Sequence, residues 1–176
     1  MDAGELQEFY CTRFATEKCY QREKPEYQKL AEEHLEALKP HLSGRILEIG
    51  CGKGHLVRTL KQAGYDAAGT EIGTRSEVAV VEPIGQYNIV LLIHVLEHLR
   101  HPRKMLRELH GLTDRTYVEI PAYDLAKMHS GYHHSAHLYD FSREHLRRLL
   151  QETGWAIEKE FYYKRHAKWF GVLGVI

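Results

Sequence analysis

The residues best suited to chemistry include a short motif near the middle of the chain, HVLEH at 94–98. The spacing H-x-x-E-H occurs on a helix of some zinc peptidases, where both histidines bind the metal. That role needs His94 and His98 one helical turn apart on an exposed helix face. The preceding residues 88–93, NIVLLI, are apolar as in a strand buried on both faces. A long helix through His94 is therefore not expected, and neither is a peptidase zinc site.

A second group of histidines and tyrosines lies between residues 122 and 140. A histidine near its unperturbed pKa can act as a base toward a hydroxyl nucleophile. Three interpretations stay open: the wall of a substrate pocket, a metal site using His133, His134 and His137, or a solvated loop. The candidates are Tyr123, His129, Tyr132, His133, His134, His137 and Tyr139. As catalytic residues we predict His134, His137 and His94.

A glycine-rich stretch, LEIGCGKGHL at 47–56, is the most informative part of the sequence. Gly50, Gly52 and Gly54 alternate with other residues between a predicted strand and a predicted helix. Glycines there let the backbone turn sharply and let a ligand approach the main chain closely. Glu71 ends the next predicted strand, where an acid can accept hydrogen bonds from both ribose hydroxyls.

Two ligand classes use this arrangement. Dinucleotide sites prefer G-x-G-x-x-G, but His55 stands where the third glycine would fall. Glu48, two residues before Gly50, would repel a pyrophosphate. The same carboxylate would favour a cationic ligand that carries an amino group.

Strands alternate with helices along the chain. We predict an α/β fold with a mostly parallel sheet in a single domain over 1–176, with an N-terminal helical segment at 1–42 and an α/β core at 43–176. Helices are predicted from Pro25 to before Pro40, after the glycine loop to Gly64, over 103–110, and from the Ser142 N-cap to Gly154. Strands are predicted over 45–50, 65–71, 78–82, 87–93, 116–121, 155–163 and about 167–175.

These motifs together resemble the class I S-adenosylmethionine-dependent methyltransferases. The pattern E-x-G-x-G-x-G begins at Glu48, and Glu71 matches the ribose acid. YNIVLLIHVLEHLRHP resembles the fourth strand and its loop, IPAYDL the end of the fifth, and DFSREHLRRLLQETGW the late helix of the small-molecule subgroup. The resemblance spans roughly residues 27 to 165.

The resemblance implies a Rossmann-like fold, S-adenosylmethionine as cofactor and a small-molecule acceptor, with an oxygen nucleophile favoured by the histidines. It also implies that the N-terminal segment folds over the cofactor as a lid, with Tyr10, Arg13 and Tyr20 as further candidates. The cofactor residues that it implies are Glu48, Gly50, Cys51, Gly52, Gly54, Glu71, Ile72, Glu82, His94 and Val95.

The chain departs from the family between Glu71 and Tyr87, where only IGTRSEVAVVEPIGQ intervenes. A parallel crossover takes a dozen or more residues, so the helix after the second strand is missing or reduced to a turn. Glu82 is the remaining acid for the adenine pocket. A non-catalytic subunit that keeps the fold is the alternative, and a histidine-cluster metalloenzyme is a third.

Composition limits the partners. Lys+Arg and Asp+Glu are both 24, so no basic excess favours nucleic acid. Cys11, Cys19 and Cys51 are an odd set, which fits a reducing compartment. The acidic start of the chain is not a secretory signal, and no apolar run approaches the ~20 residues that span a bilayer. We expect a cytoplasmic protein without a bound metal, and the sequence predicts no oligomeric state.

Overall fold

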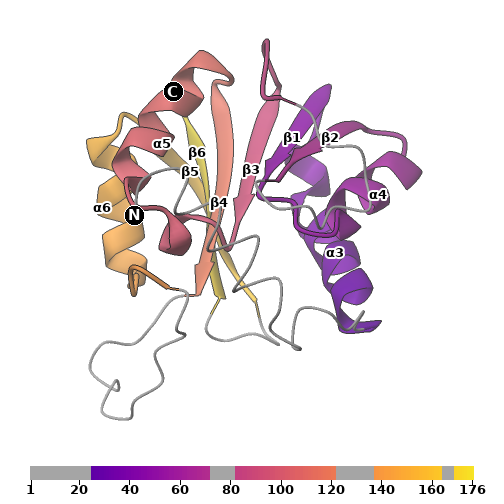
Figure 1. The fold of residues 1–176 in the computed structure, drawn as a ribbon, viewed down its shortest axis with the longest axis horizontal. Helices are drawn as coiled ribbons and strands as arrows, with labels where there is room; N and C mark the ends of the chain where they lie inside the picture. The colour runs from indigo at the N-terminus through magenta and orange to yellow at the C-terminus, as the bar shows by residue number, and fades with distance from the viewer. Residues whose placement is uncertain (1–24, 72–81, 122–136, 164–168) are drawn as a thin grey trace. The chain divides into compact units, whose positions relative to one another are not determined.

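The computed structural model describes residues 25–71, 82–121, 137–163 and 169–176 (Figure 1). The chain divides into two compact units, Met1–Ile84 and Gly85–Ile176. None of the described helices is both long and apolar enough to cross a membrane. The single domain over 1–176 stays a prediction, and each unit is treated by itself.

The first unit holds two strands that a helix connects, with another helix before them. Its elements are α3 (Pro25–Leu38), the short 3-10 helix η2 (Lys39–His41), β1 (Arg45–Ile49), α4 (His55–Gln62) and β2 (Asp66–Thr70). β1 and β2 pair in parallel, with Arg45 opposite Asp66 and Ile49 opposite Thr70. The glycine loop and α4 therefore form the crossover between two parallel strands.

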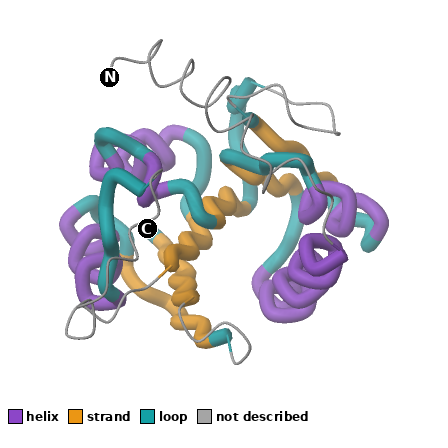
Figure 2. Tube along the Cα trace, turned by 60° about the horizontal axis from the view of Figure 1, so that its bottom comes forward, coloured by secondary structure: helices purple, strands orange, loops and turns teal. Residues whose placement is uncertain are grey.

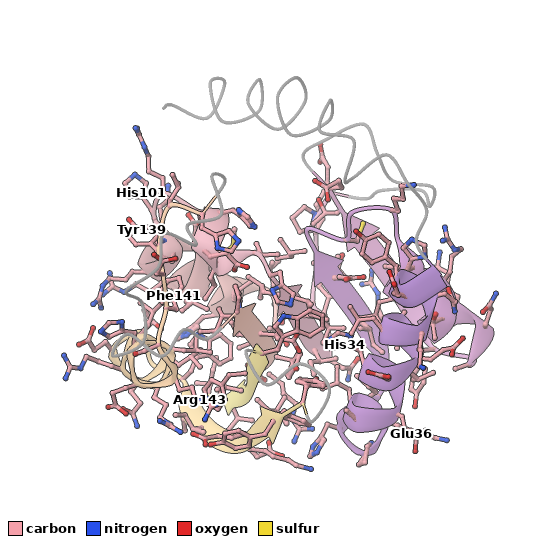
Figure 3. The ribbon with its side chains drawn as sticks, turned by 90° about the horizontal axis from the view of Figure 1, so that it is seen from below. His34, Glu36, His101, Tyr139, Phe141 and Arg143 are labelled. Atoms are coloured by element: carbon pink, nitrogen blue, oxygen red, sulfur yellow. The ribbon has the colours of Figure 1, made fainter. Side chains whose placement is uncertain are left out.

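Helix α3 belongs with this unit, because it packs against α4 (Figure 1). The Gln28 side chain donates a hydrogen bond of 3.1 Å to Thr59 Oγ1 on α4. His34 on α3 is buried (Figure 3), and its Nδ1 lies 2.9 Å from the carbonyl oxygen of Leu30. The second half of the segment predicted as a lid is thus a packed helix, while residues 1–24 lie outside the described residues.

The second unit holds four strands, in the order β3-β4-β6-β5. Its elements are β3 (Ile89–Ile93), η3 (Leu96–His98), α5 (Pro102–Glu108), η4 (Leu109–Gly111), β4 (Arg115–Pro121), α6 (Arg143–Glu152), β5 (Ala156–Tyr162) and β6 (Trp169–Val175). β3 and β4 are parallel, whereas β6 is antiparallel to both β4 and β5. The closing strands therefore give this unit a mixed sheet.

Helices α5 and α6 lie on the same face of these strands (Figures 1 and 2). Trp155 is buried at the start of β5, and its indole Nε1 donates to the Leu106 carbonyl of α5 at 3.0 Å. Ser142 caps α6 as expected, because its side chain accepts a hydrogen bond of 3.1 Å from the His145 backbone amide. Phe141, just before this cap, is buried (Figure 3).

Glycine on β6 makes room for a tyrosine on β4. A Cβ added at Gly171 would lie 2.7 Å from the Cε2 atom of the Tyr117 ring. That distance is shorter than any normal contact, so a glycine is needed where β6 passes this ring. The packing fixes Tyr117, whose hydroxyl reaches the acidic cluster described below.

Most predicted elements are confirmed, and the differences are local. The strand predicted over 87–93 begins at Ile89, because the Tyr87 backbone amide donates instead to the Leu112 carbonyl at 2.8 Å. Glu97 and His98 lie in the short helix η3, so no long helix runs through His94. The predicted strand 78–82 lies outside the described residues except for Glu82, which is in a loop.

Candidate functional site

A loop of alternating glycines connects β1 to α4 in the first unit. Gly50, Gly52 and Gly54 have φ angles of 73°, 53° and 78°. These angles lie in the left-handed region that glycine adopts without steric cost. Gly54 is also the N-cap residue of α4. The prediction that these glycines let the backbone turn sharply between β1 and α4 is confirmed.

Hydrogen bonds hold this loop to the end of β2. The backbone amides of Gly50 and Cys51 both donate to the Thr70 carbonyl, at 2.8 and 3.1 Å. The next residue of that strand end, Glu71, accepts a hydrogen bond of 2.7 Å from the Gly52 amide to its Oε2. The predicted ribose acid therefore lies directly against the middle of the glycine loop.

Glu48 is a buried carboxylate beside the same loop. Its side chain is 7% exposed, and its Oε2 accepts no hydrogen bond from the described residues. Burial, and after it the charge of Glu71, raise the pKa of Glu48 to about 8, although a backbone hydrogen bond at Val57 opposes them. A cationic ligand group reaching Glu48 would supply the missing partner.

The loop is open on one side and tightly packed on the other. Among the described residues, a Cβ added at Gly52 would meet no atom within 4 Å, whereas one added at Gly69 would lie 2.7 Å from Cys51 Sγ. Cys51 is accordingly buried, and what it offers at the loop is its backbone. The open backbone with a carboxylate at either end fits S-adenosylmethionine, which carries an amine at one end and a ribose in the middle.

The remaining predicted cofactor residues are more scattered. Glu82 is exposed in a loop, where its carbonyl accepts a 2.8 Å hydrogen bond from the Ile84 amide. Val95 is the residue before η3 in the second unit. Ile72 lies outside the described residues. The structure thus brings together Glu48, the glycine loop and Glu71, all within the first unit.

In the second unit, His94 follows β3 with an unusual backbone. Its φ of 54° makes it the one non-glycine residue with positive φ among the described residues. Such a conformation costs of order 1–3 kcal/mol and persists where its surroundings fix it. The backbone amide of His94 donates to the Glu119 carbonyl at 3.0 Å, which ties this strained turn to β4.

The ring of His94 lies between two carboxylates. Its Nε2 is 3.1 Å from Glu119 Oε1, and its Nδ1 is 3.4 Å from Glu97 Oε1. The rings of His94 and Trp169 pack in an edge-to-face arrangement at a centroid distance of 4.7 Å. Burial alone would lower the pKa of His94, but the contacts with Glu119 and then Glu97 outweigh it and raise the pKa to about 9.

Both carboxylates are deeply buried, Glu97 at 1% and Glu119 at 0% exposure. Tyr117 donates a hydrogen bond of 2.6 Å to Glu119 Oε2, and the Tyr117 and Tyr163 hydroxyl oxygens are 2.5 Å apart. Burial, and then the charge of Glu119, raise the pKa of Tyr117 well above its ordinary value. Glu119 was not among the predicted site residues, and its signal in the sequence is a lone acid inside the apolar strand TYVEIP.

Of the other predicted histidines, His137 lies beside His98. The centroids of the two rings are 4.9 Å apart, in an edge-to-face arrangement. Three side chains, those of Glu97, His98 and His137, each offer one possible ligand atom, and these atoms lie within 4.8 Å of one another. His134 and the rest of the predicted loop at 122–136 lie outside the described residues.

Comparison with known proteins agrees with this geometry. Residues 20–160 match the model of a protein family described as a methyltransferase domain. A ubiquinone biosynthesis O-methyltransferase of Bordetella avium (strain 197N) is 30% identical over 98 residues, which cover 43% of this chain and 41% of that protein. This chain therefore spans about two fifths of the length of that relative.

Solved structures show the same Rossmann-like fold. The magnesium protoporphyrin IX methyltransferase of Synechocystis PCC 6803 with bound SAH has a TM-score of 0.74 at 18% identity, covering 99% of both chains. A SAM-dependent methyltransferase from Archaeoglobus fulgidus has a TM-score of 0.70 at 15% identity, covering 94% of this chain and 100% of that one. The predicted fold class is thereby confirmed.

Proposed function

Because the chain belongs to the class I S-adenosylmethionine-dependent methyltransferases, we propose that it transfers the cofactor's methyl group to an oxygen of a small-molecule acceptor. The observation that carries this proposal is the open glycine loop between two carboxylates, within a family match that covers residues 20–160. The name of the O-methyltransferase relative supports an oxygen acceptor. The equal numbers of acidic and basic residues, 24 each, support a small molecule over a nucleic acid.

The glycine loop and its carboxylates are proposed to hold the cofactor. Glu48 would accept hydrogen bonds from the amino group of the methionine part, since the Oε2 of this buried carboxylate has no hydrogen-bond partner in the part of the chain that the structure describes. Glu71 would accept those of the ribose hydroxyls, sharing its carboxylate with the Gly52 amide. Cys51 would contribute its backbone, and the open side of Gly52 would admit the nucleoside.

The residues predicted beyond the loop keep supporting roles in the proposal. The family resemblance gives Ile72 and Glu82 as candidates for the adenosine, and His94 and Val95 as candidates for the methionine part. The ring of His94 has both nitrogens within 3.4 Å of a carboxylate, so it is poorly suited to accept a proton. Histidines of the segment that contains His134 and His137 are then the candidates for the acceptor's proton.

The bound cofactor supplies an electrophilic methyl group on a positively charged sulfur. Holding an acceptor oxygen in line with that methyl accounts for up to ~7–11 kcal/mol of the barrier in well-oriented reactions. A base within hydrogen-bonding reach of the acceptor hydroxyl adds roughly 10²–10⁴-fold. The chain's own contribution is thus to bind, to orient and to take up one proton.

A transfer assay tests the proposal. Purified protein is incubated with S-adenosylmethionine labelled in its methyl group and with panels of phenols, carboxylic acids and amines. We expect label on an oxygen of one hydroxyl-bearing compound and an equal amount of demethylated cofactor. Label on amines alone would contradict oxygen methylation. Cofactor binding with no transfer to any compound would favour the non-catalytic alternative.

A further inference from the structure

We propose that Glu97, His98 and His137 form a binding site for one divalent transition-metal ion. The three side chains come from the short helix η3 and from the segment before α6. Their ligand atoms lie within 4.8 Å of one another. The inference does not rest on the proposed methyl transfer, and it differs from the sequence expectation that no metal is bound.

The first observation is the state of the Glu97 carboxylate. Its side chain is 1% exposed, yet neither oxygen accepts a hydrogen bond from the described residues. Of the described basic nitrogens, His94 Nδ1 lies 3.4 Å from Glu97 Oε1, which is an ion-pair contact without good hydrogen-bond geometry. Burying a carboxylate this way is costly unless a cation or a donor completes it. A metal ion bound to Glu97 would supply that charge.

The second observation is that two imidazoles lie next to this carboxylate. His98 Nε2 is 3.9 Å from Glu97 Oε1, and the rings of His98 and His137 are 4.9 Å apart. Ligands ~2.0–2.2 Å from a metal are themselves roughly 3–4 Å apart, so small side-chain rotations would close the site.

Backbone contacts hold His137 in this position. The amides of Leu138 and Tyr139 both donate to the Glu97 carbonyl, at 2.8 and 3.3 Å. The Tyr139 hydroxyl donates to the Arg100 carbonyl at 3.0 Å, just after η3. Tyr139 and the buried Phe141 follow one another into α6 (Figure 3), with ring centroids 5.8 Å apart. Hydrogen bonds thus hold the segment that carries His137 against η3, which carries the other two ligands.

The surroundings of Glu97 are also those of a metal ligand. His94 bridges Glu97 to Glu119, and Glu119 in turn accepts the Tyr117 hydroxyl at 2.6 Å. Metal sites commonly have such a second layer of groups behind the ligands, and here its hydrogen bond is the one between Tyr117 and Glu119. Two buried carboxylates, Glu97 and Glu119, thus share one imidazole, and a metal ion at Glu97 would give that carboxylate a partner of its own.

Two imidazole nitrogens and one carboxylate favour zinc or another first-row transition ion over magnesium or calcium, which prefer oxygen ligands. Three protein ligands leave coordination positions for water or for an oxygen of another molecule. His137 would then be a metal ligand, which leaves His134 as the base expected from the sequence.

Titration with Co²⁺ tests the site directly, because bound Co²⁺ has a visible absorption that depends on its ligands. The untagged full-length chain is first treated with a chelator, since a histidine tag would bind the probe. We expect saturation at one Co²⁺ per chain, and release of the Co²⁺ by an equal amount of Zn²⁺. Absence of a saturable spectrum in the parent protein would overturn the proposal.

Substitutions locate the site among the chain's 13 histidines. Glu97→Gln and His137→Ala should each weaken Co²⁺ binding at least about tenfold, as expected for loss of one ligand. His145→Ala removes an exposed histidine of α6 and should leave the affinity unchanged. His137 is half-buried and outside the core, so His137→Ala should fold even if Glu97→Gln does not. If His137→Ala binds Co²⁺ as tightly as the parent protein does, the proposed site is wrong.

Discussion

Glu48→Gln should stabilise the protein while it weakens cofactor binding. The folded-state pKa of Glu48 is raised from 4.5 to about 8, so the folded carboxyl stays protonated over a range where the unfolded one ionises. A raised folded pKa gives stability that is fully present below 4.5 and is lost as the pH rises through 8. Glutamine has no charge to lose, so the variant escapes that loss.

The size of the effect follows from the same shift. Raising a pKa from 4.5 to about 8 corresponds to roughly 5 kcal/mol, as an upper limit. We expect about 1–3 kcal/mol in practice, because the buried glutamine also needs hydrogen-bond partners. The advantage of the variant should be absent near pH 4, grow through neutral pH and level off above pH 8.

Urea unfolding of the cofactor-free protein at pH 4, 7 and 9 measures this difference. Glu36→Gln, at an exposed position of α3 (Figure 3), is the matched control and should follow the parent at every pH. Calorimetry should show weaker binding of S-adenosylmethionine to Glu48→Gln despite its greater stability. A variant less stable than the parent at pH 9 would refute the reasoning that Glu48 is an uncompensated buried carboxyl.

Two further predictions concern stability alone. Gly69→Ala should destabilise the protein by about 1–3 kcal/mol in urea unfolding, because the new Cβ would lie 2.7 Å from Cys51 Sγ. Gly111→Ala, whose Cβ would meet none of the described atoms within 4 Å, should leave the stability unchanged, and an equal loss in both variants would contradict the packing explanation. Arg147 lowers the pKa of Glu160 to about 2, so this pair stabilises the fold above pH 4.5 and loses that effect as the pH falls through 2. Glu160→Gln should therefore cost about 1 kcal/mol at pH 7 and nothing near pH 2, and a loss that persists in acid would argue against the ion pair.

Local sequence signals predicted the glycine loop and most of the elements. Glycines at alternate positions between an apolar strand and an amphipathic stretch imply a tight turn into a helix, and positive φ at Gly52 confirms it. Glu71 could be placed because parallel pairing brings the end of β2 beside the end of β1. Ser142 was identifiable as an N-cap because its side chain needs only the amide of His145, three residues on.

The acidic cluster around His94 could not be predicted, because it depends on pairing between distant strands. Glu119 reaches His94 through the parallel register of β3 and β4, which no local pattern encodes. His137 reaches His98 only because the segment before α6 hydrogen-bonds to the carbonyl of Glu97. The H-x-x-E-H motif was rejected as a peptidase zinc site from the apolar strand before it, and His94 indeed faces Glu97 and Glu119.

S-adenosylmethionine is expected to bind against the backbone at Gly52, and titration calorimetry with its demethylated product is the decisive experiment. Gly64→Val is the control for Gly52→Val. Both glycines have a positive φ, 53° at Gly52 and 89° at Gly64, and a Cβ at either would meet none of the described atoms within 4 Å. Gly64, however, lies in the turn after α4 and not in the glycine loop. We predict micromolar binding to the parent and to Gly64→Val, and none to a folded Gly52→Val. Undiminished binding to Gly52→Val would show that the cofactor does not lie against this loop.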